Sequence, residues 1–130
     1  MRILLDSSVI IDALRNRRNR RNLLRALVEE GHELVCCAIN VAEVYSGMRP
    51  HEEAATAELI DSLEYVDITR EAARDAGELK LEWRRKGKTL SLPDAILGAV
   101  ALRRDLTLAT DNVRHFSMLD LKLLSLPGGT

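Results

Sequence analysis

The chain has 130 residues, enough for one domain with a single hydrophobic core. Apolar residues make up 46% and charged residues 30%, a composition that excludes disorder as the main state of the chain. Lys and Arg (19 together) nearly balance Asp and Glu (20 together), so a nucleic-acid partner would need a local basic patch, because the net charge is only −1.

Strand-like and helix-like segments alternate along the chain. The unbroken apolar run at 3–5 is typical of a strand buried on both faces, and the polar residues after it offer caps for a helix. In chain order, we predict a strand at 3–5, helices at 7–15 and 23–30, a strand at 34–38, helices at 40–47 and 50–63, a strand at 65–68, helices at 71–86 and 93–104, and strands at 106–109 and 121–126.

This alternation predicts a mostly parallel sheet with helices on both faces, the doubly wound α/β class. We expect residues 1–126 to form one domain and residues 127–130 to form a C-terminal tail.

Two features bear on where the protein resides. No apolar run approaches the roughly 18 residues of a membrane span, and no cleavable leader opens the chain. Cys36 and Cys37 are adjacent, so they cannot form the spaced disulfide framework of a small secreted domain. We therefore expect buried cysteines in a cytoplasmic protein without membrane contact.

Four acidic residues stand where ligands of such a sheet bind. Asp6 and Asp111 close predicted strands, and Glu43 and Asp94 fall in the first turn of predicted helices. Ligands of an open parallel sheet bind beyond the carboxyl ends of the strands, where the following helices begin. We therefore expect these four carboxylates, which are far apart in the sequence, to meet at this edge.

Gathered carboxylates repel one another and raise each other's pKa unless a cation compensates them. The set offers oxygen ligands only, and no Cys or His residues have a suitable spacing, so Mg²⁺ or Mn²⁺ fits best. Such an ion lowers the pKa of a bound water and stabilises a leaving oxygen, which is the chemistry of phosphodiester hydrolysis.

Each acid also has a plainer interpretation. Asp6 could cap the first helix, and Glu43 could form a capping box by bonding back to the amide of Asn40. Asp94 could act only on the helix dipole, and Asp111 could be a turn residue. The predicted convergence of the four acids is what favours a site.

Four short segments resemble, in this order and spacing, the motifs of the PIN-domain ribonucleases, and most closely those of the VapC toxins of toxin–antitoxin pairs. These segments are residues 4–12, 40–47, 92–96 and 108–116, and each contains one of the four acids. The resemblance implies a three-layer α/β/α sandwich with a parallel sheet of about five strands. It also implies a Mg²⁺- or Mn²⁺-dependent endoribonuclease.

The resemblance implies roles for the acids as well. Asp6 and Asp94 would bind the metal directly, Glu43 would complete the site directly or through water, and Asp111 or Asn112 would orient a water molecule. The last motif departs from the family's usual pattern, because its register places Asn112 where a fourth acid is usual. Either Asn112 supplies a neutral oxygen or Asp111 reaches into the site.

The resemblance extends to partners and supporting groups. The hydroxyls of Ser8 and Thr110 could steady the metal ligands. Similar proteins are homodimers that cut RNA and are inhibited by a cognate VapB antitoxin, so we expect an RNA substrate, a VapB-like antitoxin and a homodimer.

Two basic segments could serve RNA binding. Six arginines between Arg15 and Arg25 could hold RNA phosphates, or they could form a solvated loop and helix face. A second cluster at 83–88 includes Trp83, which we expect to be packed rather than stacked on a base.

Two other functions compete with the ribonuclease. A non-catalytic PIN-like module that binds an antitoxin or RNA is the alternative, and a metal titration would separate it from an enzyme. A phosphatase with Asp6 as nucleophile is disfavoured, because the enzymes it would resemble carry a second Asp where this chain has Ser8.

Overall fold

The computed structural model of the chain describes residues 1–116 and 120–128. Over this range five strands form one sheet in which every pairing is parallel. The strands are β1 (Arg2–Leu5), β2 (Glu33–Cys36), β3 (Glu64–Tyr65), β4 (Thr107–Thr110) and β5 (Lys122–Ser125). Their order across the sheet is β3-β2-β1-β4-β5, which confirms the predicted parallel sheet of about five strands.

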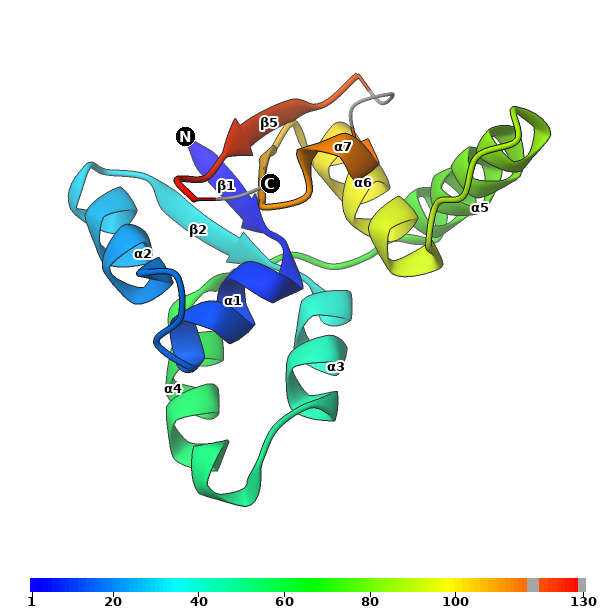
Figure 1. Cartoon of the computed structure of the whole chain (residues 1–130). Helices are drawn as coiled ribbons and strands as arrows, with labels where there is room; N and C mark the ends of the chain where they lie inside the picture. Colours follow the sequence, from blue (N-terminus) through cyan, green and yellow to red (C-terminus); the bar gives the residue numbers. More distant parts are fainter. Residues whose placement is uncertain (117–119, 129–130) are drawn as a thin grey trace.

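Helices cover both faces of this sheet (Figure 1). The described helices are α1 (Ser7–Leu14), α2 (Arg20–Glu29), α3 (Ala38–Ser46), α4 (Glu53–Ser62), α5 (Arg70–Arg85), α6 (Leu92–Arg104), α7 (Val113–Phe116) and the short 3-10 helix η1 (Pro50–Glu52). One apolar cluster joins the sheet to α1, α2 and α4, and a second joins it to α5, α6 and α7. The three-layer α/β/α sandwich is therefore confirmed.

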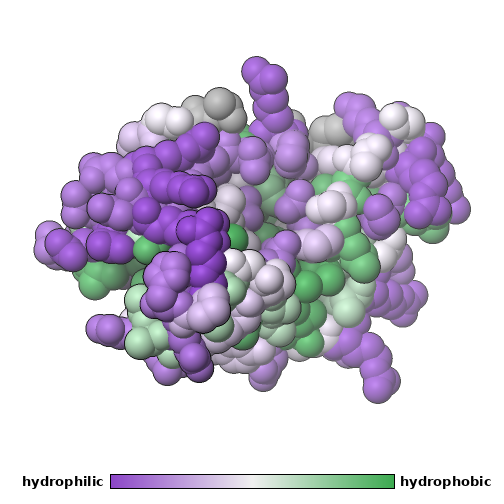
Figure 2. Space-filling view, turned by 60° about the horizontal axis from the view of Figure 1, so that its bottom comes forward, coloured by the Kyte–Doolittle hydropathy of each residue, from purple (hydrophilic) through white to green (hydrophobic). Residues whose placement is uncertain are grey.

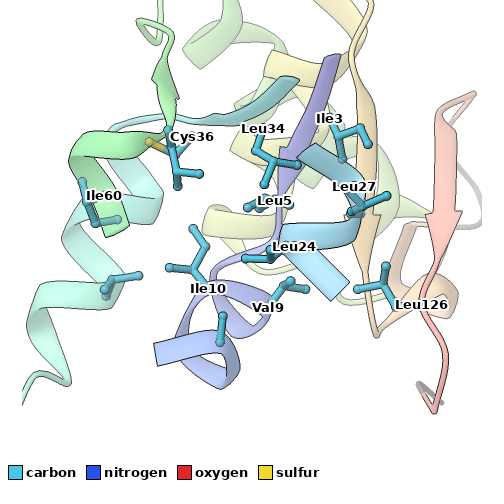
Figure 3. Packing of buried hydrophobic residues seen from close by; sticks show 14 residues of the cluster. Ile3, Leu5, Val9, Ile10, Leu24, Leu27, Leu34, Cys36, Ile60 and Leu126 are labelled. Carbon is cyan, nitrogen blue, oxygen red and sulfur yellow. The ribbon is translucent and has the colours of Figure 1, made fainter. Parts of the chain in front are cut away.

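The central strand β1 contributes to both clusters. Ile3 and Leu5 belong to the cluster beneath α1 and α2, whereas Leu4 belongs to the cluster on the other face. All three side chains are fully buried, as expected for a parallel strand covered on both faces. Figure 3 shows the first cluster, in which side chains of β1 and β2 meet those of α1, α2 and α4.

Several elements differ from the prediction. The strand predicted at 65–68 is reduced to β3 at Glu64–Tyr65, and the helices predicted at 23–30 and 40–47 begin earlier, at Arg20 and Ala38. The strand at 34–38 is shorter than predicted, because Ala38 already begins α3. The single helix predicted at 50–63 is divided into η1 and α4. Helix α7 has no predicted counterpart, because four residues are too few to show a helical period.

The cysteines and Trp83 are buried, as predicted. Cys36 and Cys37 are free thiols, and burial raises the pKa of Cys36 to about 11, so this thiol is protonated at neutral pH. Trp83 packs with Ala76 and Leu90 in a small cluster at α5 and α6, which confirms the packing interpretation.

None of the described helices combines the length and the apolar character needed to cross a bilayer. The extent of the domain, 1–126, stays a prediction. Of the predicted tail, residues 129–130 lie outside the described residues.

The topology places the ends of β1 and β4 side by side. From β1 the chain continues to β2 on one side, and it later enters β4 on the other side, so the strand order reverses at this point. The backbone N–H of Asp6 donates to the carbonyl of Ala109 (2.9 Å) and joins the two strand ends. A crevice at such a switch point is where open parallel sheets bind ligands.

Candidate active site

Asp6 lies directly at the switch point, between β1 and α1. It is the N-cap residue of α1, but its side chain makes no capping hydrogen bond, so the plainer interpretation of this carboxylate as a helix cap is wrong. Instead, Oδ2 of Asp6 accepts a hydrogen bond from Oγ1 of Thr110 (2.7 Å), the last residue of β4. The Thr110 hydroxyl also accepts from the backbone N–H of Asn112 (3.0 Å), which orients it toward Asp6.

The environment of Asp6 disfavours its negative charge. Burial raises the pKa of Asp6 above its ordinary value, the hydrogen bond from Thr110 lowers it, and the charges of Asp94 and Glu43 raise it further. Asp6 is thus close enough to two other predicted site carboxylates to be repelled by both. A bound cation would relieve this repulsion.

Glu43 is oriented from a different element, helix α3. Its Oε1 accepts a hydrogen bond from Oγ of Ser7 (2.8 Å), and the same Oγ accepts from Nδ2 of Asn40 (3.0 Å). The alternative interpretation of Glu43 as part of a capping box with Asn40 is wrong. Helix α3 begins at Ala38, so Asn40 is its third residue and Glu43 lies in its second turn.

Asn40 holds the two helix starts together. Its side chain is fully buried; Oδ1 accepts from the backbone N–H of Cys37 (2.9 Å), and Nδ2 donates to the carbonyl of Leu5 (2.9 Å) as well as to Ser7. The end of β1 and the starts of α1 and α3 are therefore joined through one amide. Neither Asn40 nor Ser7 was predicted as a supporting residue; the prediction was Ser8.

We expect Ser7→Ala to weaken metal binding by roughly 10- to 100-fold, the usual cost of losing a group that orients a ligand. The reason is that Glu43 loses the hydroxyl that holds it, while the buried Asn40 amide loses an acceptor. Titration calorimetry with Mn²⁺ measures the effect. Ser8→Ala is the matched control, because Oγ of Ser8 is buried without a hydrogen-bond partner among the described residues. An equal loss from Ser8→Ala would contradict this assignment.

Asp94 enters the site from α6. The sequence Ser91-Leu92-Pro93 starts this helix, and Oγ of Ser91 caps it by accepting from the backbone N–H of Asp94 (3.2 Å). Asp94 therefore lies in the first turn, as predicted, where the helix dipole favours a carboxylate. Its side chain is 25% exposed, and Oδ2 lies 3.6 Å from Nδ1 of His115, a histidine to which sequence analysis assigned no role.

Asp111 follows β4, but its carboxylate is occupied by arginines. Oδ1 accepts a hydrogen bond from Nη2 of Arg20 (2.6 Å), and Oδ2 lies 3.6 Å from Nη1 of Arg18. The Arg20 and Asp111 side chains are 1% and 5% exposed, so this is a buried ion pair. The prediction that Arg20 belongs to a basic stretch open to solvent or RNA is wrong, because Arg20 at the start of α2 is buried against Asp111 at the end of β4.

The donor set fits a hard divalent cation. Asp6, Glu43 and Asp94 offer carboxylate oxygens, and hydroxyls orient the first two. Among the described residues, no three His, Cys, Asp or Glu side chains are already close enough to form a complete metal site. Mg²⁺ does not require this, because it usually keeps several waters and takes only one or two carboxylates directly.

Comparison with known proteins identifies the family. A family model of the PIN domain matches residues 3–120. The chain is 35% identical to Ribonuclease VapC10 of Mycobacterium tuberculosis over 118 residues, which cover 91% of this chain and 88% of that protein. It is 30% identical to Ribonuclease VapC19 of the same organism over 115 residues, which cover 88% of this chain and 92% of that protein. The chain therefore belongs to the PIN-domain family, as the resemblance implied.

Solved structures agree with this fold. A toxin–antitoxin complex from Klebsiella pneumoniae contains a chain that is 26% identical, with a TM-score of 0.77 over 95% of this chain and 96% of that one. VapBC2 from Rickettsia felis, bound to a DNA fragment from its promoter, gives a TM-score of 0.80 at 21% identity, over 97% of this chain and 99% of that one. At that identity the second similarity concerns the fold alone.

Proposed function

We propose that the chain is a Mg²⁺- or Mn²⁺-dependent endoribonuclease and the toxin of a toxin–antitoxin pair. The main observation in support of the proposal is the acidic edge of the sheet, where the charges of Asp94 and Glu43 raise the pKa of the buried Asp6. The VapC ribonucleases among its relatives support RNA as the substrate. A cytoplasmic location belongs to the same proposal.

In the proposed site, Asp6 and Asp94 would hold the metal directly, and Glu43 would complete the site directly or through water. The bound ion would supply a water of lowered pKa and would stabilise the charge that develops on the cleaved phosphodiester. The hydroxyls of Thr110 and Ser7 would orient the carboxylates of Asp6 and Glu43 toward the ion.

For Asp111 we propose a positioning role. Arg20 binds its Oδ1 and Arg18 lies near its Oδ2, so this carboxylate has cationic partners within the protein. By holding the start of α2 against the end of β4, the pair would keep Thr110 in position for Asp6. Of the two residues that the family pattern left open, Asn112 would then be the one that orients water.

The proposed partner is a VapB-like antitoxin. Its support is that the similar solved structures include toxin–antitoxin complexes, one of them 26% identical to this chain. The homodimer remains part of the proposal and is tested by light scattering of the purified chain. Co-expression of the chain with the small protein encoded beside it, followed by co-purification, tests for the antitoxin.

Cleavage of RNA tests the enzymatic function. The purified chain is incubated with structured cellular RNA in the presence of Mg²⁺ or Mn²⁺, and in EDTA. We expect specific cleavage with either metal and none in EDTA, and mapping the new 5′ ends would give the cut site. Binding of RNA or antitoxin without any cleavage would support the non-catalytic module instead.

Metal binding should also raise the thermal stability of the folded chain. At ten times Kd, a metal that binds only the folded chain adds about 1.4 kcal/mol to the free energy of unfolding, or about 5 °C in Tm. We expect this rise with Mg²⁺ or Mn²⁺ in thermal denaturation, and we expect Asp6→Asn to remove it. Asp61→Asn, an exposed change on α4, is the control and should keep the rise. No rise at millimolar metal would count against the site.

The same variant has a distinct effect without metal. Because the pKa of Asp6 is raised in the folded chain, the folded state holds its proton more tightly than the unfolded state. The free energy of unfolding therefore decreases as the pH rises from below the ordinary value of 3.8 through the raised pKa. Asp6→Asn removes this penalty, so the metal-free variant should be more stable than the unmodified chain at pH 7, as measured by urea denaturation.

A further inference from the structure

Only some of the arginines in the basic stretch between α1 and α2 have binding partners within the protein. Arg20 is buried against Asp111, and Nη2 of Arg15 donates to the carbonyl of Gly47 (3.0 Å). Arg17, by contrast, is exposed, and no carboxylate of the described residues forms an ion pair with it. Hydrophilic side chains cover much of the left part of the face seen in Figure 2, the side on which α2 lies in Figure 1, and others lie at its right edge.

The connection between α1 and α2 has one well-defined backbone shape. Asn16, Arg18 and Asn19 have φ values of +53°, +53° and +59°, a region that non-glycine residues adopt at a cost in free energy. Hydrogen bonds hold this shape. Among them, the backbone N–H of Arg17 donates to the carbonyl of Asp12 (2.7 Å), and Nη1 of Arg20 donates to the carbonyl of Arg18 (3.1 Å). The side chain of Arg17 is thus presented by a constrained turn.

This turn faces a cavity. A cavity of about 400 Å³ lies between the turn and the segment that begins α4, and its lining includes the cationic side chains of Arg15, Arg17 and Arg49 together with His51. Glu52 also lines it, but that carboxylate is occupied: the backbone N–H of Arg49 and then the side chain of Arg15 hold the pKa of Glu52 below its usual range. Three arginines thus stand against this one carboxylate, and Arg17 forms no ion pair among the described residues, so the lining carries a net positive charge.

The cavity lies within reach of the acidic edge. Helices α1 and α3 both start at that edge and both end beside the cavity, where Arg15 joins Gly47. The eight residues of α1 span about 12 Å, at 1.5 Å per residue, so the cavity is about one short helix away from Asp6. An RNA strand placed at the carboxylates could therefore also reach these cations.

We propose that this cavity, lined by Arg17, Arg49 and His51, is an exosite that binds backbone phosphates of the RNA substrate. The inference rests on the proposed ribonuclease function. An acidic cleavage site in a chain of net charge −1 repels RNA, and a nearby cluster of arginines offsets this repulsion by binding phosphates bidentately without reading sequence. Apart from Leu14 and Ala55 the lining residues are polar or charged, which favours a phosphate over an apolar protein segment.

The test measures RNA binding separately from cleavage. In an Asp94→Asn background, Arg17→Ala and Arg49→Ala are combined, and the affinity for a fluorescein-labelled single-stranded RNA is measured by anisotropy over a range of salt concentrations. The slope of log K against log salt is negative, and each lost phosphate contact reduces its magnitude by about 0.7. The double change should therefore reduce the magnitude by about 1.4. If both proteins bind equally at an extrapolated 1 M salt, this change in slope makes the variant bind RNA about 25-fold more weakly at 0.1 M salt.

Two matched variants complete the design. Arg70→Ala with Arg74→Ala removes the same charge from α5, on the other face of the sheet, and should leave the slope unchanged. Arg17→Lys with Arg49→Lys keeps the charge and should restore most of the slope, which separates phosphate binding from an effect on folding.

If the α5 double variant and the Arg17/Arg49 double variant gave equal slopes, the exosite would be overturned, and an acidic protein segment would become the candidate ligand. The proposed function would stand in that case, provided the Asp94→Asn parent binds RNA and the unmodified chain cleaves it. If the parent failed to bind RNA and the unmodified chain failed to cleave it, both proposals would be overturned together.

Discussion

Asp94→Asn is expected to lower metal-dependent RNA cleavage by about 1,000-fold or more while leaving the chain folded. A bound metal contributes several kcal/mol of transition-state stabilisation, and each 1.36 kcal/mol corresponds to a factor of ten in rate. The fold should tolerate the change because the cap of α6 uses the backbone N–H of Asp94 and the hydroxyl of Ser91, not the Asp94 side chain. The measurement is the single-turnover cleavage rate, with circular dichroism to verify folding.

Asp105→Asn is the matched control for this prediction. Asp105 ends the same helix, its side chain is 81% exposed, and its backbone has φ +54°, a conformation that Asn also tolerates. This variant should cleave RNA at the rate of the unmodified chain. Cleavage by Asp94→Asn within tenfold of the unmodified rate would contradict the assignment of Asp94 to the metal.

Arg20→Ala is expected to lower the free energy of unfolding by about 3–5 kcal/mol, a large part of the stability of a small domain. The change removes the cation that lies 2.6 Å from a buried carboxylate and leaves Asp111 without its closest partner. It also removes the hydrogen bond to the carbonyl of Arg18, which supports the constrained turn before α2. Urea denaturation measures the loss.

A double-mutant cycle separates the ion pair from the rest of the effect. Replacing both partners, as in Arg20→Met with Asp111→Leu, should recover most of the lost stability, because a packed apolar pair leaves no buried charge. Arg25→Ala, on the exposed side of α2, is the control and should change the stability by less than about 0.5 kcal/mol. A loss of less than 1 kcal/mol for Arg20→Ala would show that water satisfies Asp111.

The same double variant also addresses the role of Asp111. As a positioning residue, Asp111 can be replaced together with Arg20 without loss of metal binding, as long as Thr110 still bonds to Asp6. A direct metal ligand could not be replaced in this way. Titration calorimetry with Mn²⁺ on the double variant distinguishes the two roles.

Much of the secondary structure could be predicted from local sequence patterns. The apolar run of β1 and the Ser91-Leu92-Pro93 start of α6 are readable because burial and capping depend on neighbouring residues. The capping-box prediction for Glu43 failed for a related reason. The pattern Asn40-Val41-Ala42-Glu43 fits a helix start, but the Asn40 side chain caps the backbone N–H of Cys37, and the helix begins at Ala38, two residues before the predicted start.

The sequence by itself determined that strands and helices alternate, that the strands are parallel, that Asp6 and Asp111 follow strands, and that Asp94 lies in the first turn of a helix. Only the tertiary structure decided that Ser7 rather than Ser8 holds Glu43, and that Arg20 leaves the basic stretch to pair with Asp111, 91 residues away. The physical reason is that a hydrogen bond or an ion pair depends on the positions of two side chains. For residues far apart in the chain, those positions are set by the packing of helices on the sheet.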